Sequence, residues 1–169
     1  MNITQPHTYY FKDDGNIPNN KLPLLIYHGA FKVSGQDGAA CLEKRFAENN
    51  WTNSWRNGVF PYHHYHSITH EVLGVYAGHA LLHMGGELGE KLNVSAGDVL
   101  VIPAGVGHKK LKASADFAVV GAYPDGRDYD ILRGQAGDRP RALENIRKVP
   151  IPLLDPVWGS EKGLSKIWK

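Results

Sequence analysis

Short runs of alternating apolar and polar residues, ended by glycine or proline, occupy the middle of the chain between Gly58 and Tyr123. The turn-forming residues recur about every eight to twelve positions, a spacing typical of antiparallel sandwiches and barrels. The runs that we expect to be strands are 59–66, 71–77, 79–83, 99–102 and 117–123. The pattern therefore predicts an all-β domain whose strands bury one face.

Two helices and several extended segments are expected outside this region. Residues 8–12 and 22–27 are predicted as strands. Ser34 begins a sequence that resembles a helix capping box. The stretch from there to about residue 49 has the apolar spacing of an amphipathic helix, with one stripe formed by Ala39, Leu42 and Phe46.

Residues 124–169 are predicted as a helical and extended C-terminal flank. A helix should follow Asp138, with Pro140 near its first turn. Prolines at positions 150, 152 and 156 favour an extended tail that crosses the barrel. The 169 residues contain no internal repeat and no linker-like stretch, so we expect a single domain over residues 1–169.

Charge and cysteine content argue against several classes of function. Lys and Arg number 19 against 17 Asp and Glu, so no strong field favours nucleic acid or acidic lipid, and a basic run (Lys109, Lys110, Lys112) is divided between two strand faces. No stretch approaches the ~20 apolar residues of a membrane span, and no signal peptide is recognisable. The single cysteine, Cys41, forbids an internal disulfide. We expect it to be buried, and we expect a cytoplasmic protein.

Histidine is unevenly distributed. Six of the nine histidines fall within residues 63–83, where an even spread would place roughly one. His64 and His66 lie two residues apart, so on a strand they project from the same face and can bind one divalent ion. Glu71 adds a carboxylate if its face of the next strand points inward. Taken alone, such a histidine pair is more often a surface or packing feature.

Two gapped patterns extend the histidine pair over residues 58–108, and together they are far more specific. The first comprises Gly58, five residues, His64-Tyr65-His66, four residues, Glu71, six residues and Gly78. The second comprises Gly97, five residues, Pro103-Ala104-Gly105, two residues and His108. They resemble the two motifs of the cupin superfamily, G-x5-HxH-x3–4-E-x6-G and G-x5-PxG-x2-H. The flanking sequence resembles the YjlB-like group of small single-domain cupins.

This resemblance implies a cupin jelly roll with one or two flanking helices. It also implies that one divalent transition metal ion is bound inside the barrel by His64, His66, Glu71 and His108. Such a ligand set accepts Fe, Mn, Ni, Co or Zn. The residues agree with that expectation. Pro103 ends the predicted strand 99–102, and His108 then enters the following strand, where it can face His64 and His66 across the barrel.

Two positions leave the ligand set open. His70 stands beside Glu71 and satisfies the shorter spacing of the first motif. Glu71 is favoured, because a carboxylate suits Fe(II) or Mn(II) and alternation groups it with Leu73. The last position of the second motif, often Asn in cupins, is Lys112 here. That change removes no ligand.

The resemblance predicts a metal-dependent enzyme, of oxygenase or isomerase type, that acts on a small organic molecule. Phe60 and Tyr62 are expected to line the substrate pocket, and Arg56 could capture a carboxylate at its mouth. No catalytic acid or base can be assigned, so a non-catalytic cupin that binds a small molecule or stores metal remains the alternative. Open sheet edges favour a homodimer.

Overall fold

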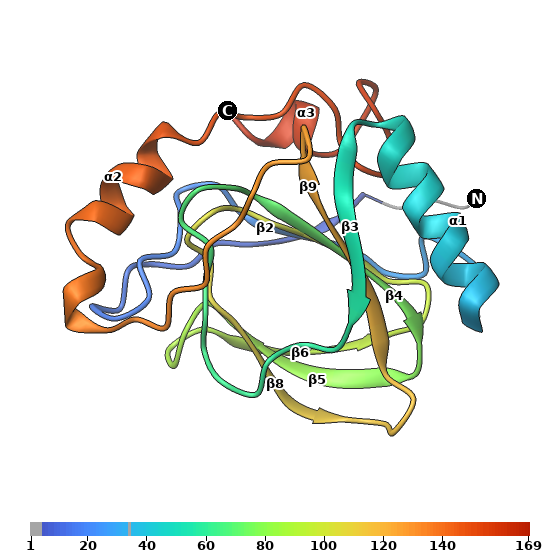
Figure 1. Ribbon diagram of the computed structural model, residues 1–169, viewed down its shortest axis with the longest axis horizontal. Coiled ribbons are helices and arrows are strands. Elements are labelled where there is room, and N and C mark those ends of the chain that lie inside the picture. The colour runs from blue at the N-terminus through green and yellow to red at the C-terminus, as the bar shows by residue number, and fades with distance from the viewer. Residues whose placement is uncertain (1–4, 34) are drawn as a thin grey trace.

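Two antiparallel β-sheets face each other in the computed structural model, which describes residues 5–33 and 35–169 (Figure 1). The larger sheet has the strand order β1-β2-β7-β4-β9-β3, with bounds β1 His7–Tyr9, β2 Leu24–Tyr27, β7 Val99–Ile102, β4 Glu71–Ala77, β9 Ala118–Pro124 and β3 Trp51–Asn57. The smaller sheet has the order β6-β5-β8, with bounds β6 Glu90–Ser95, β5 His79–Met84 and β8 His108–Ala113. The fold is an all-β jelly roll, as predicted.

Side chains of the larger sheet alternate between two hydrophobic clusters. Leu73 and Leu100 belong to the inner cluster, together with Leu82 from the smaller sheet. Val72 belongs to the outer cluster, which includes the buried residues of the first helix. Since successive strand residues point to opposite faces, Glu71 lies on the inner face with Leu73. The alternation in the sequence therefore places this carboxylate inside the barrel.

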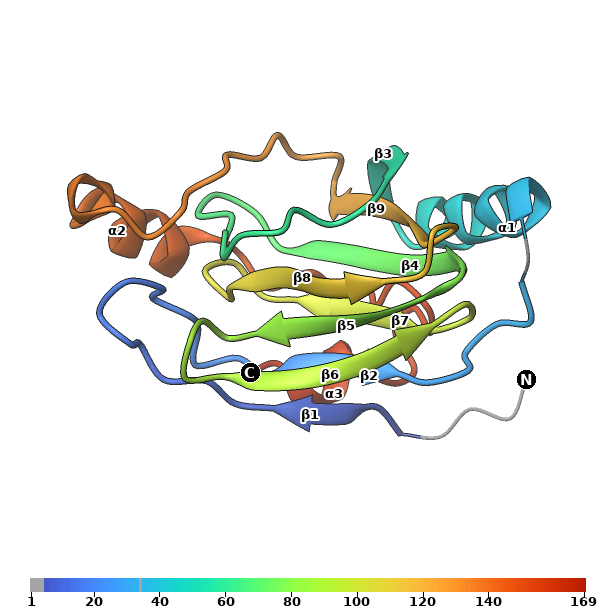
Figure 2. The same ribbon diagram turned by 90° about the horizontal axis from the view of Figure 1, so that it is seen from below.

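The helix α1 (Gly35–Glu48) packs against β3, β4 and β9 on the outer side of the larger sheet (Figure 2). It buries the predicted stripe of Ala39, Leu42 and Phe46. Phe46 lies so close to β4 that a Cβ at Gly74 would stand 2.9 Å from its Cζ. Cys41 is exposed, so its predicted burial was wrong, because it lies off the stripe that meets the sheet. The predicted cap at Ser34 lies outside the described residues.

The strand prediction was correct in the centre of the sheets, whereas two of the edge strands were missed. β4 has the predicted bounds, whereas residues 59–66 form no regular strand and make only isolated bridges through His64 and Tyr65. β3 and β6 were not expected. Both expose most of their residues, and β3 is interrupted by a shift of register next to Asn53, whose φ is 58°. The periodic signal is weak in such strands.

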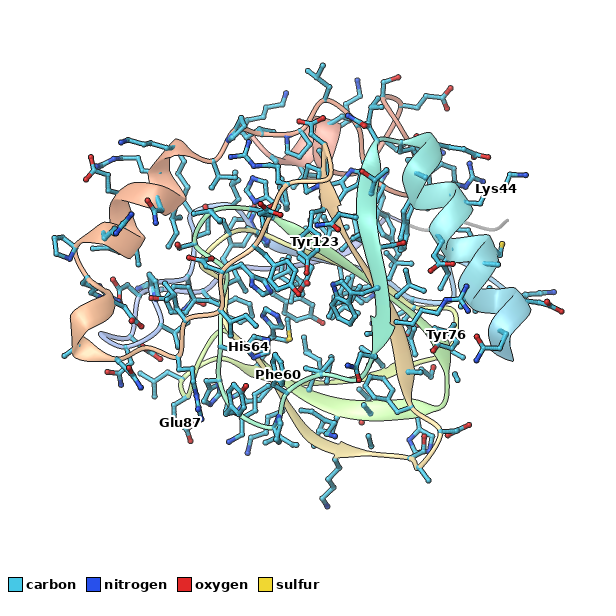
Figure 3. All side chains as sticks on the ribbon, viewed as in Figure 1. Lys44, Phe60, His64, Tyr76, Glu87 and Tyr123 are labelled. Atoms are coloured by element: carbon cyan, nitrogen blue, oxygen red, sulfur yellow. The ribbon has the colours of Figure 1, made fainter. Side chains whose placement is uncertain are left out.

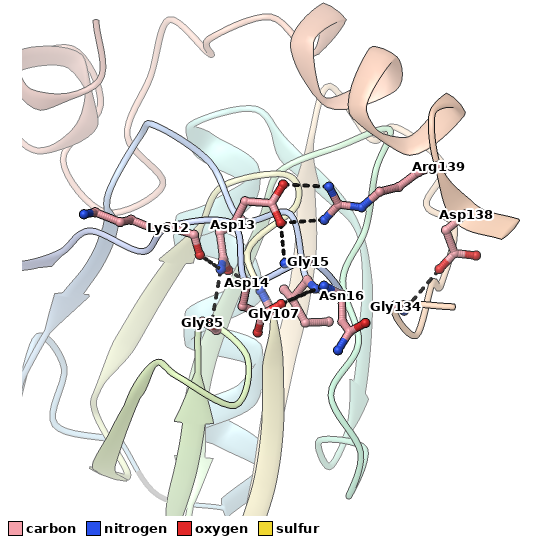
Figure 4. Close-up of polar contacts among 12 residues, drawn as sticks. Lys12, Asp13, Asp14, Gly15, Asn16, Gly85, Gly107, Gly134, Asp138 and Arg139 are labelled. Atoms are coloured by element: carbon pink, nitrogen blue, oxygen red, sulfur yellow. Dashed lines mark hydrogen bonds and ion pairs between the residues drawn. The ribbon is translucent and has the colours of Figure 1, made fainter. Parts of the chain in front are cut away.

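The C-terminal flank contains the predicted helix α2 (Arg141–Lys148) and a short helix α3 (Leu164–Ile167). Arg139 joins this flank to an N-terminal loop through a bidentate ion pair with Asp13, both N–O distances being 2.6 Å (Figure 4). Asp155, which is fully buried, anchors the tail by accepting a hydrogen bond from the Tyr27 hydroxyl at 2.6 Å. Among the described residues, no helix is long and apolar enough to cross a membrane.

Candidate metal centre

Residues 60–66 lie against β8 although they form no regular strand. His64 and His108 exchange two main-chain hydrogen bonds, with N–O distances of 3.2 and 2.9 Å. On either side, the Lys110 amide donates to the Phe60 carbonyl (2.9 Å) and the Gly105 amide donates to the His66 carbonyl (2.7 Å). This pairing fixes the register between the two sequence motifs and brings their histidines together.

The three predicted histidine ligands converge inside the barrel. One ring nitrogen from each of His64, His66 and His108 lies within 4.8 Å of the others, and all three residues are buried. Oε1 of Glu71 lies 3.3 Å from Nε2 of His66 and 3.3 Å from Nε2 of His108. The structure thus brings the three predicted histidine ligands together and places Glu71 beside two of them.

Main-chain carbonyl groups orient the three imidazole rings. Nδ1 of His64 lies 3.1 Å from the Tyr62 carbonyl, Nδ1 of His108 lies 3.2 Å from the Val106 carbonyl, and Nδ1 of His66 contacts the Asp130 carbonyl. A carbonyl oxygen can only accept, so each Nδ1 must carry the proton. In the neutral rings, Nε2 is then left with a free lone pair, the arrangement that metal-ligating histidines commonly show.

The charges of the cluster favour a bound cation. Burial, followed by the effect of His108, lowers the pKa of His64 to about 2, which keeps this imidazole neutral. Burial opposes ionisation of Glu71, yet its interactions with His66 and then His108 outweigh burial and lower the pKa of the carboxyl below its ordinary value. For His66, the effect of Glu71 outweighs burial and raises the pKa. A buried carboxylate among imidazoles is a donor set that suits a divalent transition ion.

The distances also fit a metal ion. Donor atoms at about 2.0–2.2 Å from one ion, separated by right or tetrahedral angles, lie roughly 3.0–3.5 Å apart. The separations of 3.3 Å between Glu71 and its two histidine neighbours fall within that range.

His70 points away from this centre. Its Nδ1 accepts a hydrogen bond from the Ala104 amide (2.9 Å), so Nε2 must carry the proton and donates to the Pro150 carbonyl (3.1 Å). Its ring centroid lies 4.8 Å from that of Trp168. Burial lowers the pKa of His70 to about 4. This residue therefore joins the second motif to the C-terminal tail and has no nitrogen free for a metal.

Tyr123 and Trp55 are functional candidates that the sequence reasoning missed. Nε1 of Trp55 donates a hydrogen bond to the Tyr123 hydroxyl at 2.7 Å. Burial and then the negative charge of Glu71 raise the pKa of Tyr123, so the phenol keeps its proton. Figure 3 shows Tyr123, His64 and Phe60 together in the middle of the molecule. Only the inward alternation of β9 could have indicated the position of Tyr123.

A cavity of about 340 Å³ opens beside the cluster. Phe60 lines it, whereas Tyr62 is not among the described residues that do so: its ring stacks on Phe60 with centroids 5.1 Å apart and lies under Arg133. Arg56 also lines the cavity, but Glu43 holds its guanidinium at 2.6 and 3.0 Å. The wall of this cavity is partly aromatic.

A second group of possible ligands, His63, His83 and Glu87, lies away from the cavity. Nε2 of His63 is 2.9 Å from Oε2 of Glu87, and the imidazole rings of His63 and His83 have centroids 4.8 Å apart. Lys91 and Lys109 stand opposite His83 on the neighbouring strands. The positive charges of these two lysines disfavour a bound cation here. The group is best described as the ion pair of His63 with Glu87, which holds His63 against β5.

Comparison with known proteins places the chain in a family. YjlB of Bacillus subtilis (strain 168), described as an uncharacterised protein, is 45% identical over 165 residues, covering 97% of both chains. The chain belongs to the YjlB family. Its two motifs resemble those of cupins, and its fold is the jelly roll that this resemblance implies. No family model matches the sequence.

Two solved structures resemble parts of this YjlB-family chain. Acireductone dioxygenase from Bacillus anthracis is 16% identical and aligns with 59% of this chain and 65% of its own, with a TM-score of 0.37. The epimerase RmlC from Legionella pneumophila is 15% identical and aligns with 73% of this chain and 74% of its own, with a TM-score of 0.41.

Proposed function

We propose that this protein binds one divalent transition metal ion through His64, His66, Glu71 and His108, and that it is a metal-dependent enzyme acting on a small organic molecule. The observation that carries the proposal is the orientation of the three imidazoles. Each donates Nδ1–H to a main-chain carbonyl, so that three Nε2 lone pairs are available beside one buried carboxylate.

The residues around the ligands would supply the remaining chemistry. A bound ion would polarise a carbonyl or enediol, or bind dioxygen beside a chelating substrate, and four protein donors leave room for substrate on an octahedral ion. Tyr123 holds its proton next to Glu71 and could transfer it to a bound molecule. Phe60 and Trp55 form an apolar part of the cavity wall, which would exclude water from the bound substrate.

Elemental analysis tests the metal site. Protein purified without oxygen should contain close to one transition ion per chain. His64→Ala should lose it, because this change removes one of three imidazole donors. His79→Ala is the matched control, since His79 is exposed on β5 and should leave the metal content unchanged. A wild-type protein that stays free of metal after incubation with Fe(II), Mn(II), Ni(II), Co(II) and Zn(II) would contradict the proposal.

A non-catalytic binding protein is the second candidate. Among the described residues that line the cavity, Glu71 is the one carboxylate, and it would be coordinated to the metal. No other carboxylate of the described cavity wall is then available as an acid or base. Oxygen uptake and product analysis by NMR, with metal-loaded protein and a panel of keto acids, sugars and phenols, separate the two candidates. Turnover supports an enzyme, and saturable binding without product supports a carrier.

A further inference from the structure

Lys110 projects toward the interior of the barrel. It follows His108 by two positions on β8, so the two side chains leave the strand on the same face. Across the strand pair, His108 stands opposite Met84 and Lys110 stands opposite Leu82. Both of these apolar residues belong to the cluster between the sheets. Side chains of directly opposed residues share a face, so Lys110 points inward.

This inward cation has no counter-ion. Within residues 5–33 and 35–169, no carboxylate lies within ion-pair distance of Lys110, although the side chain is half-buried and lines the cavity. The other cation of the cavity wall, Arg56, is held by Glu43. Glu71, the one carboxylate among the described residues of the cavity wall, is held between His66 and His108. A half-buried charge without a partner is costly unless a ligand neutralises it.

The apolar wall limits what that ligand can be. Phe60, Tyr129 and Ile131 line the same cavity, and each of these side chains is partly exposed. The volume of about 340 Å³ lies at the lower end of the range for small-molecule sites, roughly 300–1,000 Å³. His108 and Lys110 are separated along the strand by about 6.5 Å, so one small molecule can reach both the metal ligands and the ammonium group.

We propose that the ligand is a small organic acid with an apolar or aromatic body, whose carboxylate pairs with Lys110. Its second polar end would lie at the three-histidine centre, so this inference deepens the proposed function and rests on it. Phe60 and Tyr129 would pack against the body of the molecule. A bound divalent ion would add positive charge to the same cavity and strengthen the preference for an anion.

Calorimetric titration with phenylpyruvate, benzoate and pyruvate tests the inference, on both metal-loaded and chelator-treated protein. The methyl ester of phenylpyruvate serves as the neutral analogue. We expect at least one acid to bind, and the ester to bind more weakly than phenylpyruvate. Lys110→Met should weaken binding of the acid about 10-fold or more, because it keeps the length of the side chain and removes its charge. Lys110→Arg should restore most of the affinity.

Lys109→Met is the matched control, because Lys109 stands opposite His83 on the other face of β8 and should leave acid binding unchanged. Circular dichroism and metal content of Lys110→Met should equal those of wild type. Equal affinity of wild type and Lys110→Met for the acids, or no binding of any of the three acids, would overturn the inference. If the protein holds no metal but binds acids through Lys110, the proposed metal site is contradicted, and only the pairing of the carboxylate with Lys110 is supported.

Discussion

His64 and His108 exchange two main-chain hydrogen bonds and hold their imidazole rings with centroids 4.0 Å apart. The backbone pairing belongs to a segment that is not a regular strand, so its register depends on a few contacts. Further contacts on either side come from Phe60 and His66. The geometry of the candidate metal centre therefore depends on main-chain pairing as well as on the identity of the ligands.

Tyr123→Phe should weaken metal binding without abolishing it. The phenol lies near Glu71, and loss of a group that orients a ligand typically lowers metal affinity by about 10- to 100-fold. Competition with a chelator of known affinity measures the change. Tyr9→Phe is a suitable comparison, since Tyr9 lies on β1 and does not line the cavity. An unchanged affinity for Tyr123→Phe would show that the phenol does not support Glu71.

His70 should make stability depend on pH. Its pKa of about 4 in the folded protein lies below the ordinary 6.5, so the unfolded chain binds more protons between these values. The free energy of unfolding should therefore fall as pH falls from about 6.5 to 4, with His70 contributing up to about 3 kcal/mol of that loss. Above pH 6.5 its contribution should be constant.

His70→Asn isolates this effect, because the amide oxygen can accept the Ala104 hydrogen bond and the side chain does not titrate. Urea unfolding of chelator-treated wild type and variant should show a stability gap at pH 7 that narrows toward pH 4. A gap that is constant with pH would mean that the imidazole is not buried in its neutral form.

Gly74→Ala should destabilise the protein by about 1–3 kcal/mol, because the new methyl group meets the Phe46 ring at 2.9 Å and Leu42 at 3.0 Å. The midpoint of urea unfolding measures the loss. Gly137→Ala is the matched control, since a Cβ there meets nothing within 4 Å. That substitution should be neutral or slightly stabilising. Equal midpoints for the two variants would contradict the described packing of α1 on β4.

Asp155→Ala should cost about 3 kcal/mol or more, because it leaves several buried donors without an acceptor. The carboxylate accepts from the Tyr27 hydroxyl and from the main-chain amides of Val157, Trp158 and Leu164. Tyr27→Phe removes one of these bonds and should cost less, about 1 kcal/mol. Thermal unfolding of both variants checks the order. A larger loss for Tyr27→Phe would contradict the role of Asp155 as the centre of this network.

The sequence predicted which side chains meet inside the barrel, because their positions follow local rules. Alternation along one strand places Glu71 with Leu73, and the two gapped motifs identify the histidines that β8 and its neighbour bring together. The sequence could not show every group that orients those ligands, because one of them is distant in the chain. The carbonyl of Asp130, for example, contacts His66 from 64 positions away.

The same limit explains the open choice between His70 and Glu71. Both fit the spacing of the first motif, and the position of His70 depends on the packing of the C-terminal tail. Trp168 and the Pro150 carbonyl meet His70 on the outer side of the sheet. The position of Tyr62 outside the cavity likewise depends on Arg133, which covers its ring from the C-terminal flank.

The exposed position of Cys41 on α1 has a practical consequence. It is the one thiol among 169 residues, and its helix lies on the outer side of the larger sheet, away from the cavity between the sheets. A nitroxide spin label or a fluorophore can therefore be attached at a single point without cysteine replacement. With Mn(II) as the added ion, paramagnetic broadening of the nitroxide spectrum would report occupancy of the barrel without any substrate being added.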